Sequence, residues 1–162
     1  MKLTRTVAPM GEPLSVEEVK LHLRLDTDED DALIAALTSV AREQAEHQTG
    51  LLLMAQTWVL EVTAGEQVSL AKMLPVQDLQ TTVPYLLDGN WPPTLTAEQD
   101  AQITVRCGFG TAEDVPPSIK QWMLLQIGGW YEHREAIVAG NPVALPRTAV
   151  DALLDAWTVP RC

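Results

Sequence analysis

The sequence is short of basic residues. It has 11 Lys and Arg against 22 Asp and Glu, which gives a formal net charge of −11 at pH 7. The acidic excess is spread along the chain, with ten acids against five bases in residues 1–50, six against two in 51–110, and six against four in 111–162. A protein that grips nucleic acid by neutralising phosphates needs a basic surface, so the shortage argues against that class. Acidity by itself also fits a protein that its charge keeps soluble.

Long apolar runs and cysteines are scarce too. No run approaches the roughly 20 apolar residues that span a bilayer, so we expect no membrane partner. The stretch MKLTRTVAPMGEPLS has two basic residues but no apolar core behind them, which does not fit a signal peptide, and we expect the protein to stay in the cytoplasm where it is made. Its two cysteines, Cys107 and Cys162, are expected to be reduced thiols rather than a disulfide.

The sequence does have enough apolar material for a core. Of its 162 residues, 46% are hydrophobic and 20% are charged, which is typical of a soluble globular protein. A chain of this length buries roughly 70% of the surface that it exposes when unfolded. We therefore predict one domain over residues 1–162.

Helical patterns occupy both ends of the chain. Ser15 followed three residues later by Glu18 predicts a capping box at the start of a first helix. A second helix is predicted over about residues 29–48, because apolar residues recur there at helical spacing. A third is predicted to begin at Pro116 and Pro117, since proline suits a first turn, where no N–H is needed.

The third helix has apolar residues on nearly all of its sides, which indicates burial from several directions. We predict that it is the spine of the core, with Trp122, Leu125 and Trp130 inside. Gly128 and Gly129 in its middle each cost about 1 kcal/mol relative to alanine. We expect another backbone to approach this pair closely as compensation.

Between residues 51 and 110 the pattern changes to short strands separated by turn residues. The predicted strands are QTWVLEVT, QVSLA, TTVPYLLD and AQITVRCGF, and a last short helix, RTAVDALLDAW, is predicted near the C-terminus. The predicted fold is α+β but mainly helical. It is a helical bundle framework over 14–50 and 115–158, built around a long central helix, with a small antiparallel β excursion at 51–110.

Five of the six residues from 26 to 31 are acidic, namely Asp26, Asp28, Glu29, Asp30 and Asp31. Their alternation is that of the first ligands of an EF-hand calcium loop. That loop needs glycine at its sixth position and glutamate at its twelfth, where this sequence has Asp31 and Leu37. The start of a helix explains the cluster better, because negative charge in a first turn is stabilising by about 0.3–1 kcal/mol per residue.

No catalytic pattern emerges from the remaining residues. The sequence has no P-loop and no Gly-x-Ser-x-Gly elbow. Glu43 and Glu46, with His47 beside them, share a helix face that could serve a carboxylate-bridged metal pair, although a solvated face is the commoner explanation of such a pattern. We therefore predict no catalytic residues, no metal and no cofactor.

Tryptophan is unusually frequent for a chain with so few other aromatic residues. The sequence has five Trp and one Phe, and Trp is a preferred anchor of protein interfaces. Trp91 lies in a predicted turn and Trp157 near the C-terminus, where both are hard to bury. Each either covers the domain's own core or anchors a partner, and the sequence leaves both readings open.

The order of these features resembles a known family. LSVEEVKLHLRLDTDEDDALIAALTSVAREQAEHQTG leads into QTWVLEV, and after the β segment come VRCGFGTAEDVPPSIKQWMLLQIGGWYEHREAIV and DALLDAW. This series is similar to the head–tail connector (adaptor) proteins of long-tailed phages and prophages. The resemblance covers nearly the whole chain and is strongest at 14–58 and 103–138. The Gly128-Gly129 pair departs from it, since relatives tend to carry helix formers there.

The resemblance implies a structural virion protein without an active site. Such proteins form a ring in the neck of the virion, expected to be twelvefold on the portal, between the portal protein and the next neck, stopper or tail-completion protein. DNA would pass through the ring only as cargo, and the host cytoplasm would be the place of assembly. On this view the tail after the last helix would dock the portal through Trp157, Val159 and Arg161. The acidic edge at 26–31 would face either the DNA channel or the outside.

Two other functions stay open beside the connector. An acidic inhibitor that mimics DNA would need carboxylates in two rows at phosphate-like spacing, whereas only 26–31 is dense. A helical metal-dependent hydrolase using Glu43 and Glu46 would bind manganese or magnesium tightly.

Overall fold

The computed structural model describes residues 2–133 and 150–159, and its contacts divide the chain into two units. The first, which we name the β unit, comprises 1–11, 50–114 and 159–162, and the second, the helical unit, comprises 12–49 and 115–158. This division does not test the predicted single connector domain, which stays a prediction.

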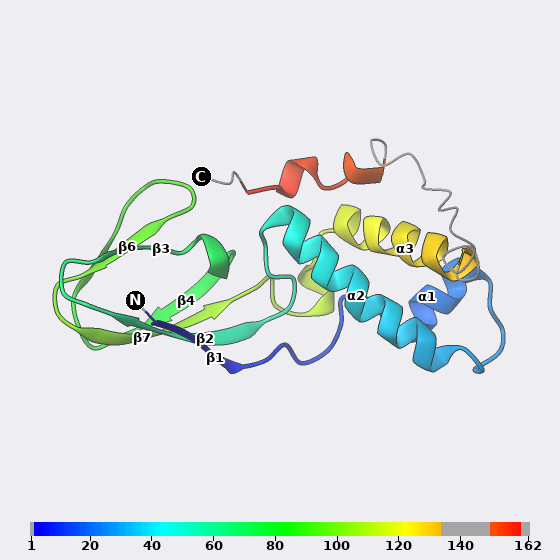
Figure 1. The fold of residues 1–162 in the computed structure, drawn as a ribbon, viewed down its shortest axis with the longest axis horizontal. Coiled ribbons are helices and arrows are strands. Elements are labelled where there is room, and N and C mark those ends of the chain that lie inside the picture. The colour runs from blue at the N-terminus through cyan, green and yellow to red at the C-terminus, as the bar shows by residue number, and fades with distance from the viewer. Residues whose placement is uncertain (1, 134–149, 160–162) are drawn as a thin grey trace. The chain divides into compact units, whose positions relative to one another are not determined.

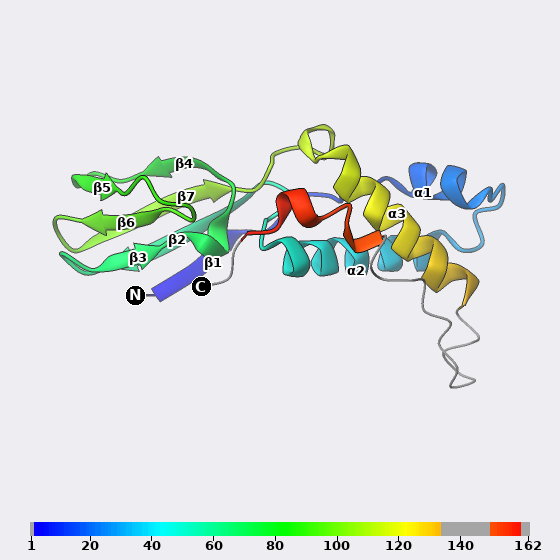
Figure 2. The same ribbon diagram turned by 90° about the horizontal axis from the view of Figure 1, so that it is seen from above.

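Seven strands in the described part of the β unit form two antiparallel sheets (Figure 1). The four-stranded sheet has the order β1-β2-β7-β4, with β1 at Lys2–Val7, β2 at Gln56–Val62, β7 at Ala101–Cys107 and β4 at Val76–Gln80. The three-stranded sheet has the order β3-β6-β5, with β3 at Gln67–Ser69, β6 at Thr94–Ala97 and β5 at Tyr85–Leu87. Figure 2 shows both sheets from above.

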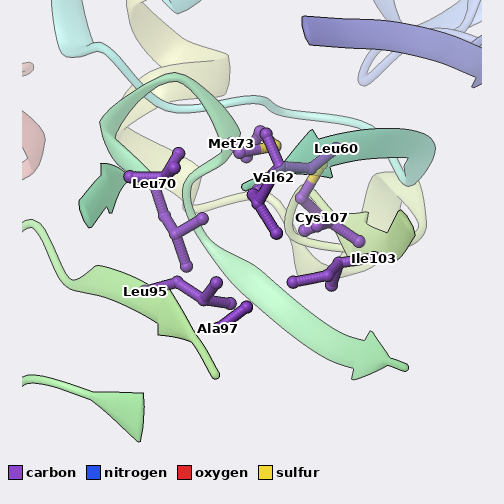
Figure 3. Close-up of a cluster of buried hydrophobic side chains, with 10 residues drawn as sticks. Leu60, Val62, Leu70, Met73, Leu95, Ala97, Ile103 and Cys107 are labelled. Atoms are coloured by element: carbon purple, nitrogen blue, oxygen red, sulfur yellow. The ribbon is translucent and has the colours of Figure 1, made fainter. Parts of the chain in front are cut away.

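The core of the β unit follows from the two-residue period of its strands. In β7, Ile103, Val105 and Cys107 are buried while the residues between them are not, because successive side chains of a strand point to opposite faces. Both sheets contribute to the cluster that results (Figure 3). Its ten members are Leu60, Val62, Val68, Leu70, Met73, Leu95, Ala97, Ile103, Val105 and Cys107. Fully burying one large apolar side chain stabilises the fold by about 1.5–3 kcal/mol.

The helical unit contains α1 at Val16–Leu23, α2 at Asp31–Thr49 and α3 at Pro117–Glu132. The predicted capping box is confirmed at the start of α1. The Ser15 hydroxyl accepts a hydrogen bond from the Glu18 backbone N–H (3.1 Å), and the Glu18 carboxylate accepts one from the Ser15 N–H (2.7 Å). Helix α1 ends at Arg24, which has the left-handed φ of 58°. Short 3-10 helices are η1 at Ala71–Met73, η2 at Ala112–Asp114 and η3 at Asp155–Trp157.

Helix α3 is the most apolar of the three helices, and four of its side chains are buried: Ile119, Trp122, Met123 and Ile127. Trp122 is completely buried, whereas Leu125 and Trp130 are only half-buried. The expected close backbone approach to the glycine pair is not seen at Gly128. A Cβ there would first meet side-chain atoms of α1, from Leu23 at 3.7 Å and His22 at 3.8 Å.

The predicted fold class is wrong in its balance of helix and strand. The described residues form three α-helices beside two antiparallel sheets, so the molecule is not a mainly helical bundle with a small β insertion. Strands were predicted at β2, β3, β5 and β7, but β1, β4 and β6 were missed. The predicted helix RTAVDALLDAW begins outside the described residues, and within them η3 forms its end.

The missed strand β1 shows why the prediction failed. It pairs with β2, from Lys2 opposite Glu61 to Val7 opposite Thr57, and its side chains are nearly all exposed. Of its apolar residues, Leu3 packs against the core while Val7 is 46% exposed, so the strand has no regular inward-facing apolar pattern. Its stability comes mainly from pairing with residues far along the chain. Strand propensity depends on this context more than helix propensity does.

Gly108 provides a test of how tightly the β unit is packed. Its φ is +98°, and a Cβ built on it would lie 2.2 Å from the Met54 carbonyl oxygen. Gly65 is the matched control, since its φ is +74° but no atom lies within 4 Å of the position of its Cβ. We expect Gly65→Ala to lower the free energy of unfolding by about 1–2 kcal/mol, the strain of the left-handed backbone alone. Gly108→Ala should lower it by clearly more, because the backbone at Met54 must move. Urea unfolding measures both, and equal losses would contradict the packing argument.

Candidate functional site

The acidic stretch between α1 and α2 is organised around one lysine. The ammonium group of Lys20, on α1, hydrogen-bonds to the carboxylate of Asp28 and pairs with Asp31 Oδ1 at 3.0 Å. The Lys20 side chain is only 15% exposed, whereas that of Asp28 is 88% exposed. The hydrogen bond from Lys20 lowers the pKa of the Asp28 carboxyl, and the hydrogen bonds to Asp28 and Asp31 raise the pKa of Lys20.

A second contact ties the same stretch to α3. The hydroxyl of Tyr131 donates a hydrogen bond to the carboxylate of Asp30. Asp26 and Glu29 are exposed and make no hydrogen bond or ion pair with another described residue. The five predicted acidic residues therefore divide into Asp28, Asp30 and Asp31, which anchor the helices to one another, and the other two, which face solvent. Two unpaired carboxylates are fewer than the two rows that a DNA mimic would need.

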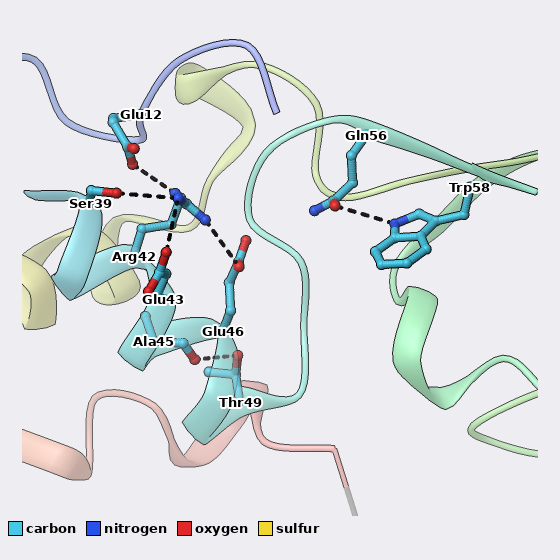
Figure 4. Close-up of polar contacts among 9 residues, drawn as sticks. All are labelled: Glu12, Ser39, Arg42, Glu43, Ala45, Glu46, Thr49, Gln56 and Trp58. Atoms are coloured by element: carbon cyan, nitrogen blue, oxygen red, sulfur yellow. Dashed lines mark hydrogen bonds and ion pairs between the residues drawn. The ribbon is translucent and has the colours of Figure 1, made fainter. Parts of the chain in front are cut away.

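Glu43 and Glu46 lie in a cluster around the Arg42 guanidinium (Figure 4). Arg42 Nε donates to Glu12 at 2.8 Å, Nη1 to Glu46 at 3.2 Å, and Nη2 lies 3.9 Å from Glu43. Burial would lower the pKa of Arg42, but the hydrogen bond to Glu12 and the neighbouring carboxylates raise it above its usual value. The Arg42 guanidinium thus pairs with Glu43 and Glu46, the carboxylates that the hydrolase hypothesis assigned to a metal.

The C-terminal segment is held against the protein itself. The Trp157 indole N–H donates to the Ser118 hydroxyl at 2.9 Å, and the Trp122 indole N–H donates to the Asp151 carboxylate at 3.1 Å. Val159 is 7% exposed. Of the three predicted portal-docking residues, Trp157 is thus half-buried and Val159 buried, while Arg161 lies outside the described residues.

The structure also shows an apolar surface that the sequence analysis missed. Tyr85, Leu86 and Leu87 of β5 are 37%, 67% and 47% exposed, and Trp91 in the following turn is 61% exposed. A signal was present in the sequence, because three consecutive large apolar residues in a strand must point to both faces of a sheet. At a sheet edge such residues cannot all be covered. Trp91 was the one member that the sequence analysis singled out.

Within the described ranges, 2–133 and 150–159, no three His, Cys, Asp or Glu side chains gather closely enough to hold a metal ion. In the same part of the chain, no helix is both long and apolar enough to cross a membrane. Cys107 is a buried thiol beside the Gln56 carbonyl oxygen (3.6 Å), and Cys162 lies outside the description.

The fold is similar to that of solved chains from gene transfer agent (GTA) particles. One similar solved chain comes from the neck of an empty GTA particle computed with C6 symmetry, with a TM-score of 0.78 and 24% identity. A second comes from the virion of a native GTA particle (0.72, 25%), and a third from the neck of a native GTA particle computed with C12 symmetry (0.72, 23%). Each match covers 100% of this chain and 97% of the other. No curated protein sequence matches the chain.

Residues 13–86 match the model of the phage gp6-like head-tail connector proteins. The matched stretch covers α1, α2 and the part of the β unit from β2 to β5. The predicted resemblance to head–tail connector proteins is confirmed over these residues.

Lys20 supplies a test of the junction between α1 and α2. We expect Lys20→Met to return the pKa of Asp28 toward its ordinary value of 3.8 and to lower the protection of the first turn of α2 against amide exchange. Because the folded-state pKa of Asp28 is depressed, the ion pair stabilises the fold above pH 3.8 and is lost as the pH falls below that value. The pH titration of the Asp28 carboxyl by NMR measures the shift.

Lys72→Met is the matched control, since Lys72 is an exposed lysine of the β unit. It should leave the Asp28 titration as it is in the unaltered protein. An Asp28 pKa that is the same in Lys20→Met and in the unaltered protein would show that Lys20 does not hold the junction.

Proposed function

We propose that this protein is a head–tail connector that forms a ring in the neck of a virion, between the portal protein and the next neck, stopper or tail-completion protein. The observation that carries the proposal is the fold match over 100% of the chain to proteins of GTA particles, together with the connector family match at 13–86. The symmetries of the two matched necks, C6 and C12, support a ring that follows a twelvefold portal. The proposal includes no catalytic activity, no cofactor and assembly in the host cytoplasm.

The docking half of the proposal assigns the portal contact to the C-terminal segment. Two of the three proposed docking residues already contact the protein itself. The indole N–H of Trp157 is already bonded to Ser118, and Val159 is buried, so removing either residue would also disturb the protein's own packing. Arg161 carries the only positive charge after Asp155, and we assign it the main contact with the portal, supported by the exposed part of Trp157.

The portal contact is tested by mixing the chain with its portal protein. We expect native mass spectrometry to show a ring of connector subunits on the portal, and a pull-down to recover both proteins. Arg161→Glu should abolish recovery because it reverses the charge of the proposed contact. Deleting only 160–162 should do the same, and it spares Trp157 and Val159, which a deletion of 156–162 would remove.

Arg24→Glu is the control for portal binding, because it makes the same charge change at an exposed residue of the helical unit. Retained portal binding by Arg161→Glu would refute the docking assignment while leaving the ring intact. Only monomers at high concentration, with the portal present, would refute the connector ring itself.

The acidic edge is proposed to line the DNA channel. Asp26 and Glu29 are exposed and unpaired in the described chain, so their charges are available to repel phosphate. A lumen that repels DNA lets it pass, whereas basic groups there would bind it in a salt-dependent way.

Charge reversal tests the channel assignment. In assembled rings, Asp26→Lys with Glu29→Lys should increase retention of double-stranded DNA at low salt, and added salt should abolish the increase. Glu17→Lys with Asp155→Lys changes the net charge equally at two other exposed sites of the helical unit and should leave retention low. Equal retention by the two variants would place the acidic edge outside the channel.

A further inference from the structure

The two sheets of the β unit have four outer edges, formed by β1 and β4 in one sheet and by β3 and β5 in the other. Natural proteins protect such edges with charges, prolines, bulges or very short polar strands. β4 has an irregular register between Val76 and Asp78, and β3 is a three-residue strand with exposed Gln67 and Ser69. β5 is as short as β3 but has no charge, proline or bulge in its three residues, since it pairs regularly with β6 and consists of Tyr, Leu and Leu.

The register of β5 shows that its apolar side chains are on both faces of the sheet. Tyr85 lies opposite Ala97 and Leu87 opposite Leu95, and both of those β6 residues are buried in the core. Paired residues of neighbouring strands share a face. Tyr85 and Leu87 therefore lie on the core-facing side of the sheet, on its outermost strand. Leu86 points to the other face and is 67% exposed. A partner strand beside β5 would cover apolar surface on both faces at once.

Acidic groups flank β5 at both of its ends. Asp88 follows it directly, and its carboxylate, whose pKa is lowered by the Thr94 backbone N–H, also accepts from Asn90. Glu98 lies at the other end, where its N–H donates to the Pro84 carbonyl oxygen at 3.1 Å. The β5 edge is therefore apolar in the middle and negative at both ends.

The outer edge of β1 has the opposite charge. Residues 2–11 contain two bases, Lys2 and Arg5, and no acid, in a chain with a net charge of −11. Lys2 makes one exposed ion pair with Glu61 at 3.7 Å, and Arg5 lies over the Trp58 ring at 5.7 Å. Exposed pairs of this kind contribute little, so both cations remain able to meet a further partner.

We propose that β5 of one copy pairs in antiparallel fashion with β1 of the next copy, so that the ring is held together by a strand contact between β units. This inference rests on the proposed connector ring and names the surfaces that close it. A closed ring needs two different complementary surfaces on each subunit, and Figure 2 shows β1 and β5 at opposite edges of the β unit. Strand addition at an open edge is a common mode of protein recognition.

The antiparallel register that aligns the charges sets Leu3 opposite Leu87, Thr4 opposite Leu86 and Arg5 opposite Tyr85. It brings Lys2 to Asp88, on the same face as Thr4 and Leu86. Three residues of β1 separate the positions of its two cations, which is about 10 Å along a strand, similar to the length of β5. Trp91, in the turn after β5, would pack at the periphery of this strand contact.

Disulfide cross-linking between two single-cysteine variants tests the contact. All chains carry Cys162→Ser, while the buried Cys107 is kept. Thr4→Cys and Leu86→Cys are made in separate chains, so that a cross-link can form only between copies. Neighbouring strands bring Cα atoms to the spacing that a disulfide requires. We expect a cross-linked dimer only when the two variants are mixed and oxidised, alone at high concentration or with the portal protein.

Ser69→Cys on β3 replaces Leu86→Cys in the control mixture, because it places a thiol on the other exposed edge of the same sheet. We expect no dimer from that mixture. Rings seen by native mass spectrometry without a cross-link between Thr4→Cys and Leu86→Cys would overturn the strand contact and leave the connector ring standing. Neither rings nor cross-links, with and without portal, would overturn both proposals.

A charge swap supplies an independent test. Lys2→Glu should cause loss of the ring, and adding Asp88→Lys in the same chain should restore it, because the ion pair is then reversed across the contact. Circular dichroism melts verify that each variant is folded. Rings unaffected by Lys2→Glu, or a loss that Asp88→Lys fails to rescue, would contradict the proposed register.

Discussion

The β unit depends on the pairing of β2 with β7. Seven residues of each strand pair without interruption, from Gln56 opposite Cys107 to Val62 opposite Ala101. β1 attaches to the outer side of β2 and β4 to the outer side of β7, and everything from residue 63 to 100 is one excursion between the two strands. The ten-residue core then forms where the strands of this excursion fold back over the pair. Loss of this pairing would split the four-stranded sheet into two separate strand pairs, β1 with β2 and β7 with β4, so its stability sets the stability of the whole unit.

In the helical unit, two basic side chains each neutralise more than one acidic group. The side chains of Lys20 and Arg42 are only 15% and 11% exposed, and each contacts more than one carboxylate. A mostly buried cation that lost these partners would be strongly destabilising. The acidic residues around them therefore have a structural reason to be where they are, and the net charge of −11 overstates the negative surface that a partner meets.

Local signals explain what the sequence could predict. Ser15 with Glu18, and the proline pair before α3, are short-range patterns, and the helices begin where they indicate. β2 and β7 also have a clear alternation. The missed strands depend on distant residues: β1 is exposed and defined by its pairing with β2, and β6 has only four residues. The acidic stretch leads into α2, but the helix begins at Asp31, and of the five acids only Asp31 lies in its first turn. The ties of this stretch to Lys20 and Tyr131 depend on three-dimensional packing that no spacing rule contains.

The shortness of β5 has a consequence for the timing of assembly. A contact built on three strand residues is weak by itself, since isolated strand pairs of this size are marginal in water. Subunits at low concentration would then remain apart, and a platform that holds several copies side by side would raise their effective concentration and favour ring closure. An apolar edge of this length therefore suits a subunit that stays monomeric until it is bound to such a platform. A longer edge would let subunits polymerise without one.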